Sequence, residues 1–199
     1  MFDERVRVRI APAARLVARE LVRWGVRANG VTVTTFLVAC AAAVLVAREQ
    51  RVAGLLVWLV SRIGDGLDGA VARESHTTPF GAYLDITLDM AAYAAMVLAF
   101  ASLHPDLAVA WMLVLAGYMM VITTTLALSD AARAAARRVS ETNRTFQFTP
   151  GLTEAGETTV AYCLWALFPT HVPWLVWIWV AALFATSLQR TYSAWRLLR

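Results

Sequence analysis

Long stretches without charged residues recur along the chain, and short polar segments separate them. A helix of ~20 apolar residues crosses about 30 Å of hydrocarbon. Three uncharged stretches come near or exceed that length, namely Val31–Ala47, Leu107–Ser129 and Val172–Gln189. Three shorter apolar segments become full spans if each extends into the polar segment beside it, namely Val52–Ile63, Met90–Leu103 and Thr158–Phe168. The pattern predicts an all-α, polytopic membrane protein with six transmembrane helices.

Composition argues against the alternative of three spans joined to a soluble domain that buries the other segments as core helices. Of the 199 residues, 59% are hydrophobic and only 16% are Asp, Glu, Lys or Arg. A soluble shell around the remaining apolar segments needs more polar residues than this chain has. The length is that of a single domain.

The first 28 residues differ from the rest because arginine recurs through them. Arginines at intervals of four, from Arg15 to Arg27, share one face of a helix that Pro12 is expected to start. This pattern predicts an amphipathic helix at the membrane interface, with its arginines toward anionic headgroups; a solvated cytoplasmic helix is the alternative. We therefore divide the chain into an interfacial helix, residues 1–28, and a six-span domain, residues 29–199. Asn29 or Thr32 is expected to cap the first span.

The distribution of arginine, which accounts for all 18 basic residues, predicts the orientation of the spans. Arginines gather before residue 30, at residues 133–144 and at the end of the chain, whereas the loops at 104–106 and 169–171 have none. With six spans, these arginine-rich segments all fall on one side, which the positive-inside rule makes cytoplasmic. Arg48 and Arg51, in the first external turn, are the exception. We expect a multi-pass protein of the cell (inner) membrane with both termini cytoplasmic.

Four aspartates lie where the second and third spans approach the cytoplasmic side. Asp65 and Asp68 are three residues apart, and Asp85 and Asp89 are four apart, so each pair lies on one face of its helix. Ionisable groups at membrane depth are costly and mark functional sites. Four carboxylates in a low dielectric repel one another unless cations compensate them. Their hard oxygen ligands suit Mg²⁺ or Mn²⁺, and two such ions suit chemistry at a phosphoryl centre.

Glycines and arginines accompany the aspartates. Gly69 and Gly81 allow an anionic ligand to approach the helix backbone closely. Arg62 and Arg73 offset part of the negative charge, and Arg73 is placed to hold phosphate oxygens.

The frame Asp65-x-x-Asp68-Gly69-x-x-Ala72-Arg73…Gly81-x-x-x-Asp85-x-x-x-Asp89 resembles the signature of the CDP-alcohol phosphotransferases, also called CDP-alcohol phosphatidyltransferases. Eight fixed positions at fixed spacing, in a membrane context, make this a specific pattern. Seven residues separate Arg73 from Gly81, where the family usually has eight. The missing residue falls in the turn, so the two helix faces are unchanged.

The resemblance implies an enzyme of phospholipid synthesis. Members transfer a substituted phosphoryl group from a CDP-linked donor, most often CDP-diacylglycerol, to an alcohol and release CMP. The implied metal ligands are Asp65, Asp68, Asp85 and Asp89, and Asp89 would also take the proton of the acceptor hydroxyl. The implied donor-binding residues are Asn29, Thr32, Gly69, Ala72, Arg73, Thr78 and Gly81. The expected cofactor is Mg²⁺ or Mn²⁺, as two ions, and the expected partners are the CDP-linked lipid donor, an alcohol acceptor, membrane lipids and a second copy of the chain, with no nucleic acid.

The acceptor is less constrained. Arg133, Arg137 and Arg138 form either an anion site for a phosphorylated acceptor or part of the positive-inside signal, and the second interpretation is favoured. Glu154 and Glu157 near the fifth span disfavour a phosphorylated acceptor, because carboxylates repel phosphate. A neutral or cationic acceptor, such as an inositol or an amino alcohol, or a lipid alcohol, stays open.

Two other functions are compatible with the aspartates. A membrane prenyltransferase also uses paired aspartates and Mg²⁺ on a diphosphate, but such enzymes have more spans and lack the glycine and arginine positions of this frame. A cation transporter with an intramembrane carboxylate site would leave Gly69, Arg73 and Gly81 without a clear role.

Overall fold

The computed structural model describes residues 2–138 and 153–197, with side chains described within 12–131 and 153–197. These residues form helices joined by turns, with no strand among them, so the expected all-α class is confirmed. The described elements are α1 (Phe2–Arg23), α2 (Ala28–Ala47), α3 (Arg51–Glu74), α4 (Pro79–Leu103), the 3-10 turn η1 (Pro105–Leu107), α5 (Ala108–Arg138), α6 (Ala155–Leu167), the 3-10 turn η2 (Pro169–His171) and α7 (Val172–Leu197).

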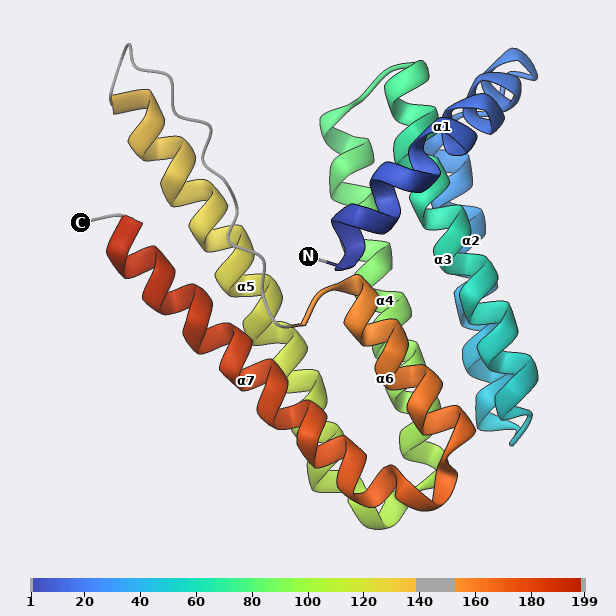
Figure 1. The fold of residues 1–199 in the computed structure, drawn as a ribbon, viewed down its shortest axis with the longest axis vertical. Coiled ribbons are helices and arrows are strands. Elements are labelled where there is room, and N and C mark those ends of the chain that lie inside the picture. The colour runs from blue at the N-terminus through green and yellow to red at the C-terminus, as the bar shows by residue number, and fades with distance from the viewer. Residues whose placement is uncertain (1, 139–152, 198–199) are drawn as a thin grey trace.

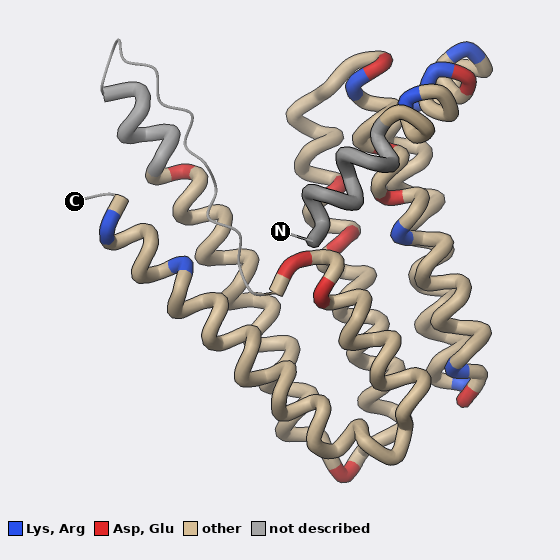
Figure 2. The backbone as a smooth tube through the Cα atoms, in the orientation of Figure 1, with Lys and Arg blue, Asp and Glu red and all other residues tan. Residues whose placement is uncertain are grey.

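All six segments expected to span the membrane are helical, but they differ in length and polarity. Four described helices are long and apolar enough to cross a membrane: α2, α4, α5 together with η1, and α7 together with η2. Helix α6 has only 13 residues, and the second half of α3 carries the charged frame. Charged residues lie mostly in the upper half of the view and recur at its lower end, with uncharged stretches of helix between them (Figure 2). A multi-pass protein is supported, while spans at α3 and α6 stay predictions.

Two packed groups of helices make up the fold (Figure 1). Helix α2 packs against α3 and α4, and α1 lies across α3. Helix α5 pairs with α7, and the short α6 contacts both α3 and α7. The aspartate frame, on α3 and α4, therefore lies in the group built by the first half of the chain.

Small residues let α2 and α3 pack closely. Ala39 and Ala42 on α2 are fully buried, and a Cβ added to Gly54 of α3 would lie 2.6 Å from Val46 Cγ2 and 2.8 Å from the Ala42 carbonyl oxygen. Close backbone approach through small residues is a common way for helices to associate in membranes. The approach brings the first turns of α2 beside the aspartates of α3.

The N-terminal helix is present, but two expectations about helix starts are wrong. Helix α1 begins at Phe2, so Pro12 lies inside it and does not start it. Helix α2 has Arg27 at its N-cap with no side-chain capping bond, so neither Asn29 nor Thr32 caps it. Thr32 does not cap α2 because it lies inside the first turns of the helix. Its hydroxyl faces the Ala28 carbonyl oxygen and Asp68 Oδ2 as acceptors. The interfacial position of α1 stays a prediction.

Candidate metal and donor site

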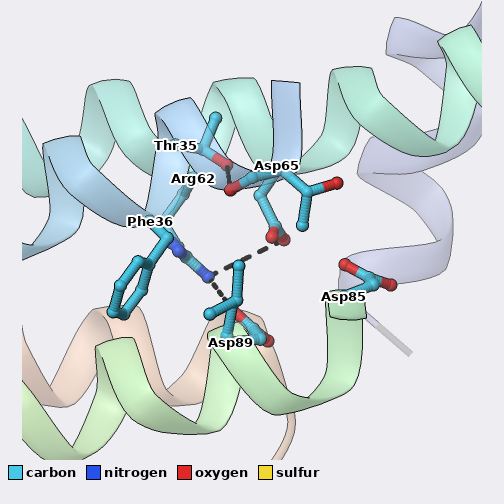
Figure 3. A pocket seen from close by; sticks show the side chains of 8 residues that line it. Thr35, Phe36, Arg62, Asp65, Asp85 and Asp89 are labelled. Carbon is cyan, nitrogen blue, oxygen red and sulfur yellow. Dashed lines mark hydrogen bonds and ion pairs between the residues drawn. The ribbon is translucent and has the colours of Figure 1, made fainter. Parts of the chain in front are cut away.

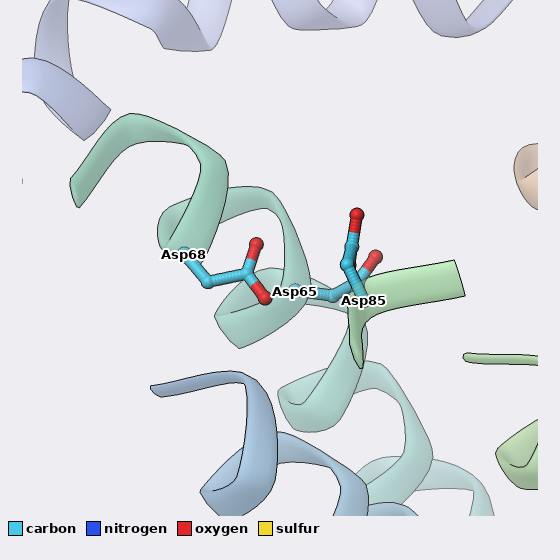
Figure 4. A group of neighbouring side chains, drawn as sticks. All are labelled: Asp65, Asp68 and Asp85. Carbon is cyan, nitrogen blue, oxygen red and sulfur yellow. The ribbon is translucent and has the colours of Figure 1, made fainter. Parts of the chain in front are cut away.

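Three of the four aspartates converge from two helices. Ligand oxygens of Asp65 and Asp68, on α3, and of Asp85, on α4, all lie within 4.8 Å of one another. The carboxylates gather between the two helices (Figure 4). An i, i+3 pair on one helix and a third acid on its neighbour supply a compact set of hard oxygen donors, which fits Mg²⁺ or Mn²⁺.

A neutral donor from α2 holds Asp68. The Thr32 hydroxyl donates to Asp68 Oδ2 at 2.8 Å, and both side chains are buried. This contact requires α2 to lie close to α3 at Gly64, where an added Cβ would be 2.2 Å from Thr35 Cγ2. Thr32 therefore holds a candidate metal ligand in this structure, and its expected contact with the CDP-linked donor stays a prediction.

Asp89 is held apart from this group by an arginine. Arg62 Nη1 forms a short ion pair with Asp89 Oδ1 and lies 3.7 Å from Asp65 Oδ2. The guanidinium carbon lies 4.4 Å from the Trp58 ring centroid and 5.3 Å from that of Tyr93. Arg62 therefore links the two acidic helices, whereas the role of Asp89 as a metal ligand and base stays a prediction (Figure 3).

A small pocket lies between these groups. Its walls come from α2, α3 and α4, and its lining residues are Thr32, Thr35, Phe36, Arg62, Asp65, Asp85, Leu88 and Asp89. The sequence did not single out Thr35, Phe36 or Leu88, because their place depends on the crossing of three helices. The sequence did indicate that Arg62 lies near the aspartates, because it is three residues before Asp65 on the same helical face.

Several expected donor-binding residues meet at the starts of α2 and α4. Thr78 is the N-cap of α4, and its hydroxyl oxygen accepts a hydrogen bond from the Gly81 amide at 3.0 Å. A Cβ added to Gly81 would lie 3.0 Å from Asn29 Oδ1 and 3.1 Å from Thr78 Oγ1. Asn29, Thr78 and Gly81 are thus neighbours, and glycine is the residue that fits between the other two.

The arginine of the frame lies over its glycine. A Cβ added to Gly69 would be 3.3 Å from Arg73 Nη1, so the Arg73 side chain folds back toward Gly69 on the surface of α3. Ala72 is partly buried on the same helix. Helix α3 ends at Glu74 and α4 begins at Pro79, so the short spacer is a turn of residues 75–78, as expected.

The candidate acceptor residues are less well placed by the structure. Arg133, Arg137 and Arg138 belong to α5, but their side chains lie outside the described residues. Glu154 and Glu157 form a capping box at the start of α6, in which each side chain accepts from a backbone amide. Their position is explained by helix capping, so their bearing on the acceptor is weaker than the sequence suggested.

Comparisons with known proteins point to one family. The sequence profile described as CDP-alcohol phosphatidyltransferase matches residues 26–187. The inner membrane protein YnjF of Escherichia coli (strain K12) is 32% identical over 205 aligned positions, which cover 100% of this chain and 98% of that protein. The archaetidylinositol phosphate synthase of Methanothermobacter thermautotrophicus is 46% identical over 63 residues, covering 31% of this chain and 32% of that protein.

Solved structures share the fold. The phosphatidylinositol phosphate synthase of Mycobacterium tuberculosis with CDP-DAG bound has a TM-score of 0.73 at 24% identity, covering 92% of this chain and 93% of that one. The same enzyme in complex with manganese and citrate has a TM-score of 0.71 at 24% identity, with 92% and 88% coverage.

Proposed function

Because this chain belongs to the CDP-alcohol phosphatidyltransferase family, and is thus a transferase of substituted phosphate groups, we propose that it moves a phosphatidyl group from CDP-diacylglycerol to an alcohol and releases CMP. The observation that carries the proposal is the convergence of Asp65, Asp68 and Asp85 from α3 and α4. The resemblance to the family implied that these three acids of the frame bind metal.

Asp65, Asp68 and Asp85 would hold a divalent cation, Mg²⁺ or Mn²⁺, with Asp89 joining to hold a second. When bound, such ions neutralise the diphosphate of the donor and the charge on its leaving group. Asn29, Thr78 and Gly81 lie together at the starts of α2 and α4, where a nucleotide can reach backbone and small side chains. Arg73 supplies a cation for the phosphate oxygens.

In the reaction, the acceptor hydroxyl oxygen forms a bond to the phosphorus that carries the diacylglycerol. The bond from that phosphorus to the oxygen of CMP breaks, and CMP leaves with the electron pair. The proton of the hydroxyl goes to the Asp89 carboxylate, which acts as general base. A base aligned with the reacting hydroxyl accelerates the reaction in two ways, by accepting the proton and by orienting the hydroxyl.

The membrane arrangement belongs to the same proposal. Six spans, with α3 and α6 completing the four apolar helices, place both termini and the frame at the cytoplasmic side of the inner membrane. Helix α1 lies at the interface, and the enzyme acts as a homodimer. The four long apolar helices and the inner-membrane relative support this arrangement.

The acceptor is proposed to be a polyol. Two of the proteins named above are synthases of inositol phosphate lipids, and the capping role of Glu154 and Glu157 weakens the main sequence argument against a phosphorylated alcohol. Inositol phosphate and neutral alcohols such as inositol are therefore the first acceptors to compare.

The central test is release of CMP by purified protein. Reactions contain CDP-diacylglycerol, Mg²⁺ or Mn²⁺, and one alcohol each from a panel that includes inositol phosphate, inositol, glycerol phosphate and an amino alcohol, with CMP and lipid mass as readouts. Asp89→Asn should reduce release at least a hundredfold, because removal of a general base costs about 10²–10⁴ in rate. Asp106→Asn, in η1 at the opposite end of the bundle, is a matched control and should retain activity.

Two results would contradict the proposal and identify one of the alternative functions. Release of pyrophosphate from a prenyl diphosphate, with no CMP from any CDP-linked donor, would identify a prenyltransferase. Mn²⁺ flux into liposomes without nucleotide, again with no CMP formed, would identify a transporter.

A further inference from the structure

Arg62 is a largely buried cation flanked by two aromatic rings. Its side chain is 13% exposed and lies against the rings of Trp58 and Tyr93, at 4.4 and 5.3 Å from guanidinium carbon to ring centroid. Trp58 and Tyr93 are themselves buried. Stacking on two aromatic faces, together with burial, restricts where the guanidinium can go.

One nitrogen of this guanidinium serves both acidic helices. Arg62 Nη1 pairs with Asp89 Oδ1 of α4 and lies 3.7 Å from Asp65 Oδ2 of α3. A second metal ion that used Asp65 and Asp89 would bridge the same two carboxylates. In Figure 3 the guanidinium lies between these side chains, and Asp85 lies to one side.

The four acids thus fall into two classes. Asp65, Asp68 and Asp85 form the compact group with ligand oxygens within 4.8 Å, and Asp89 is outside it, on Arg62. A first cation can bind the group without disturbing the bond between Arg62 and Asp89. A cation that uses Asp89 Oδ1 must displace Arg62 from that oxygen.

We propose that Arg62 is a positioning residue that acts as an internal cation: it holds Asp89 when metal is absent and competes with a divalent cation for it. The two metal-binding events are therefore unequal, the tighter at the three-carboxylate group and the weaker at Asp89. The inference rests on the proposed function in one respect, that the aspartates bind a divalent cation.

The competition has a measurable size. Binding that must first break a charge-assisted hydrogen bond is weakened by the free energy of that bond, which corresponds to about a ten- to hundredfold change in affinity. Arg62→Gln removes the competing charge and keeps a polar side chain of similar reach. In this variant, the Mn²⁺ half-saturation concentration of the weaker site should fall by about tenfold or more.

The experiment is Mn²⁺ titration of the purified full chain, with free Mn²⁺ followed by electron paramagnetic resonance. Wild type should bind in two unequal classes, Asp89→Asn should retain only the tighter class, and Arg62→Gln should bring the two classes together. Arg62→Lys, which keeps the positive charge, should stay closer to wild type than Arg62→Gln does.

A double-mutant comparison separates exchange at Asp89 from a general effect of charge. If Arg62 acts through Asp89, adding Arg62→Gln to Asp89→Asn should leave Mn²⁺ affinity nearly unchanged. If the same gain in affinity appears in the Asp89→Asn background, Arg62 acts only as a nearby charge and the inference is overturned. If Arg62→Gln does not fold, the comparison of wild type with Asp89→Asn still tests the inference. Identical Mn²⁺ titrations of these two proteins, each with a single class of sites, would overturn it.

Failure of the inference and failure of the proposed function look different. Wild-type protein that binds no Mn²⁺ contradicts the metal site of the proposed function itself. Wild-type protein that binds Mn²⁺ and releases CMP, with Arg62→Gln titrating as wild type does, contradicts only the role of Arg62.

Discussion

Gly64 lies where α3 comes closest to Thr35 of α2, and its replacement by alanine perturbs the site without changing a polar group. An added Cβ would lie 2.2 Å from Thr35 Cγ2 and 3.4 Å from Thr35 Cβ. Carbon atoms pack at about 3.5–4.0 Å, so one of them must move by more than ~1 Å. Thr35 is buried and β-branched, and its hydroxyl donates to the Thr32 carbonyl at 2.9 Å. The strain therefore falls on the distance between α2 and α3.

Two opposing effects set the size of the change. Alanine is favoured over glycine inside a helix by about 0.8–1.0 kcal/mol, and overpacking costs about 1–3 kcal/mol. Gly64→Ala should therefore change the free energy of unfolding by between zero and about −2 kcal/mol. Gly66→Ala is the matched control, because a Cβ there meets nothing within 4 Å, and it should gain up to about 1 kcal/mol.

Thermal unfolding in detergent measures the difference. A gap of about 1–3 kcal/mol between Gly64→Ala and Gly66→Ala corresponds to roughly 2–12 °C in Tm for a chain of this size. Thr35→Ser removes the clashing Cγ2 and keeps the hydroxyl, so it should recover stability and Mn²⁺ binding in the Gly64→Ala background. A Gly64→Ala protein that unfolds at or above the Tm of Gly66→Ala would refute the reasoning.

Three further changes test other parts of the structure. Thr32→Val removes the donor to Asp68 and should raise the Mn²⁺ half-saturation concentration by about tenfold or more, as loss of such outer partners commonly does; an unchanged titration would remove Thr32 from the site. Glu49→Gly should raise Tm, because Glu49 has φ 63° and relief of a left-handed conformation contributes about 1 kcal/mol; a lower Tm would show that the side chain matters more than the backbone. Gly117→Ala should lower the free energy of unfolding by up to ~2 kcal/mol, because its Cβ would lie 2.8 Å from Leu183 Cβ; a stabilised variant would mean that α5 and α7 separate at little cost.

Local signals predicted the helices well. The apolar runs became α2, α5 and α7, and the segment Met90–Leu103 extends back to Pro79 in α4, through the polar residues beside it, as expected. The N-caps were harder, since Asn29 and Thr32 have capping side chains but lie inside α2. Capping propensity is a local preference, and contacts with a neighbouring helix override it.

The site was predictable where spacing alone determines geometry. The i, i+3 spacing of Asp65 and Asp68 puts both on one face of α3, and the structure brings Asp85 to the same place. The pairing of Asp89 with Arg62 was not predictable in detail, because it depends on how α3 and α4 cross. Arg62 was expected only to offset charge, and spacing could not say which acid it would hold.

The contacts of the acids explain why the metal and the fold are coupled. Asp68 accepts a hydrogen bond from Thr32, and Asp89 has the Arg62 ion pair. Asp65 has Arg62 only at 3.7 Å, and within the described residues no hydrogen bond or ion pair holds Asp85. Two of the three acids in the three-carboxylate group, Asp65 and Asp85, thus have the weakest protein partners. A cation bound there neutralises them in the folded chain and not in the unfolded one, so metal binding stabilises the fold that creates the site.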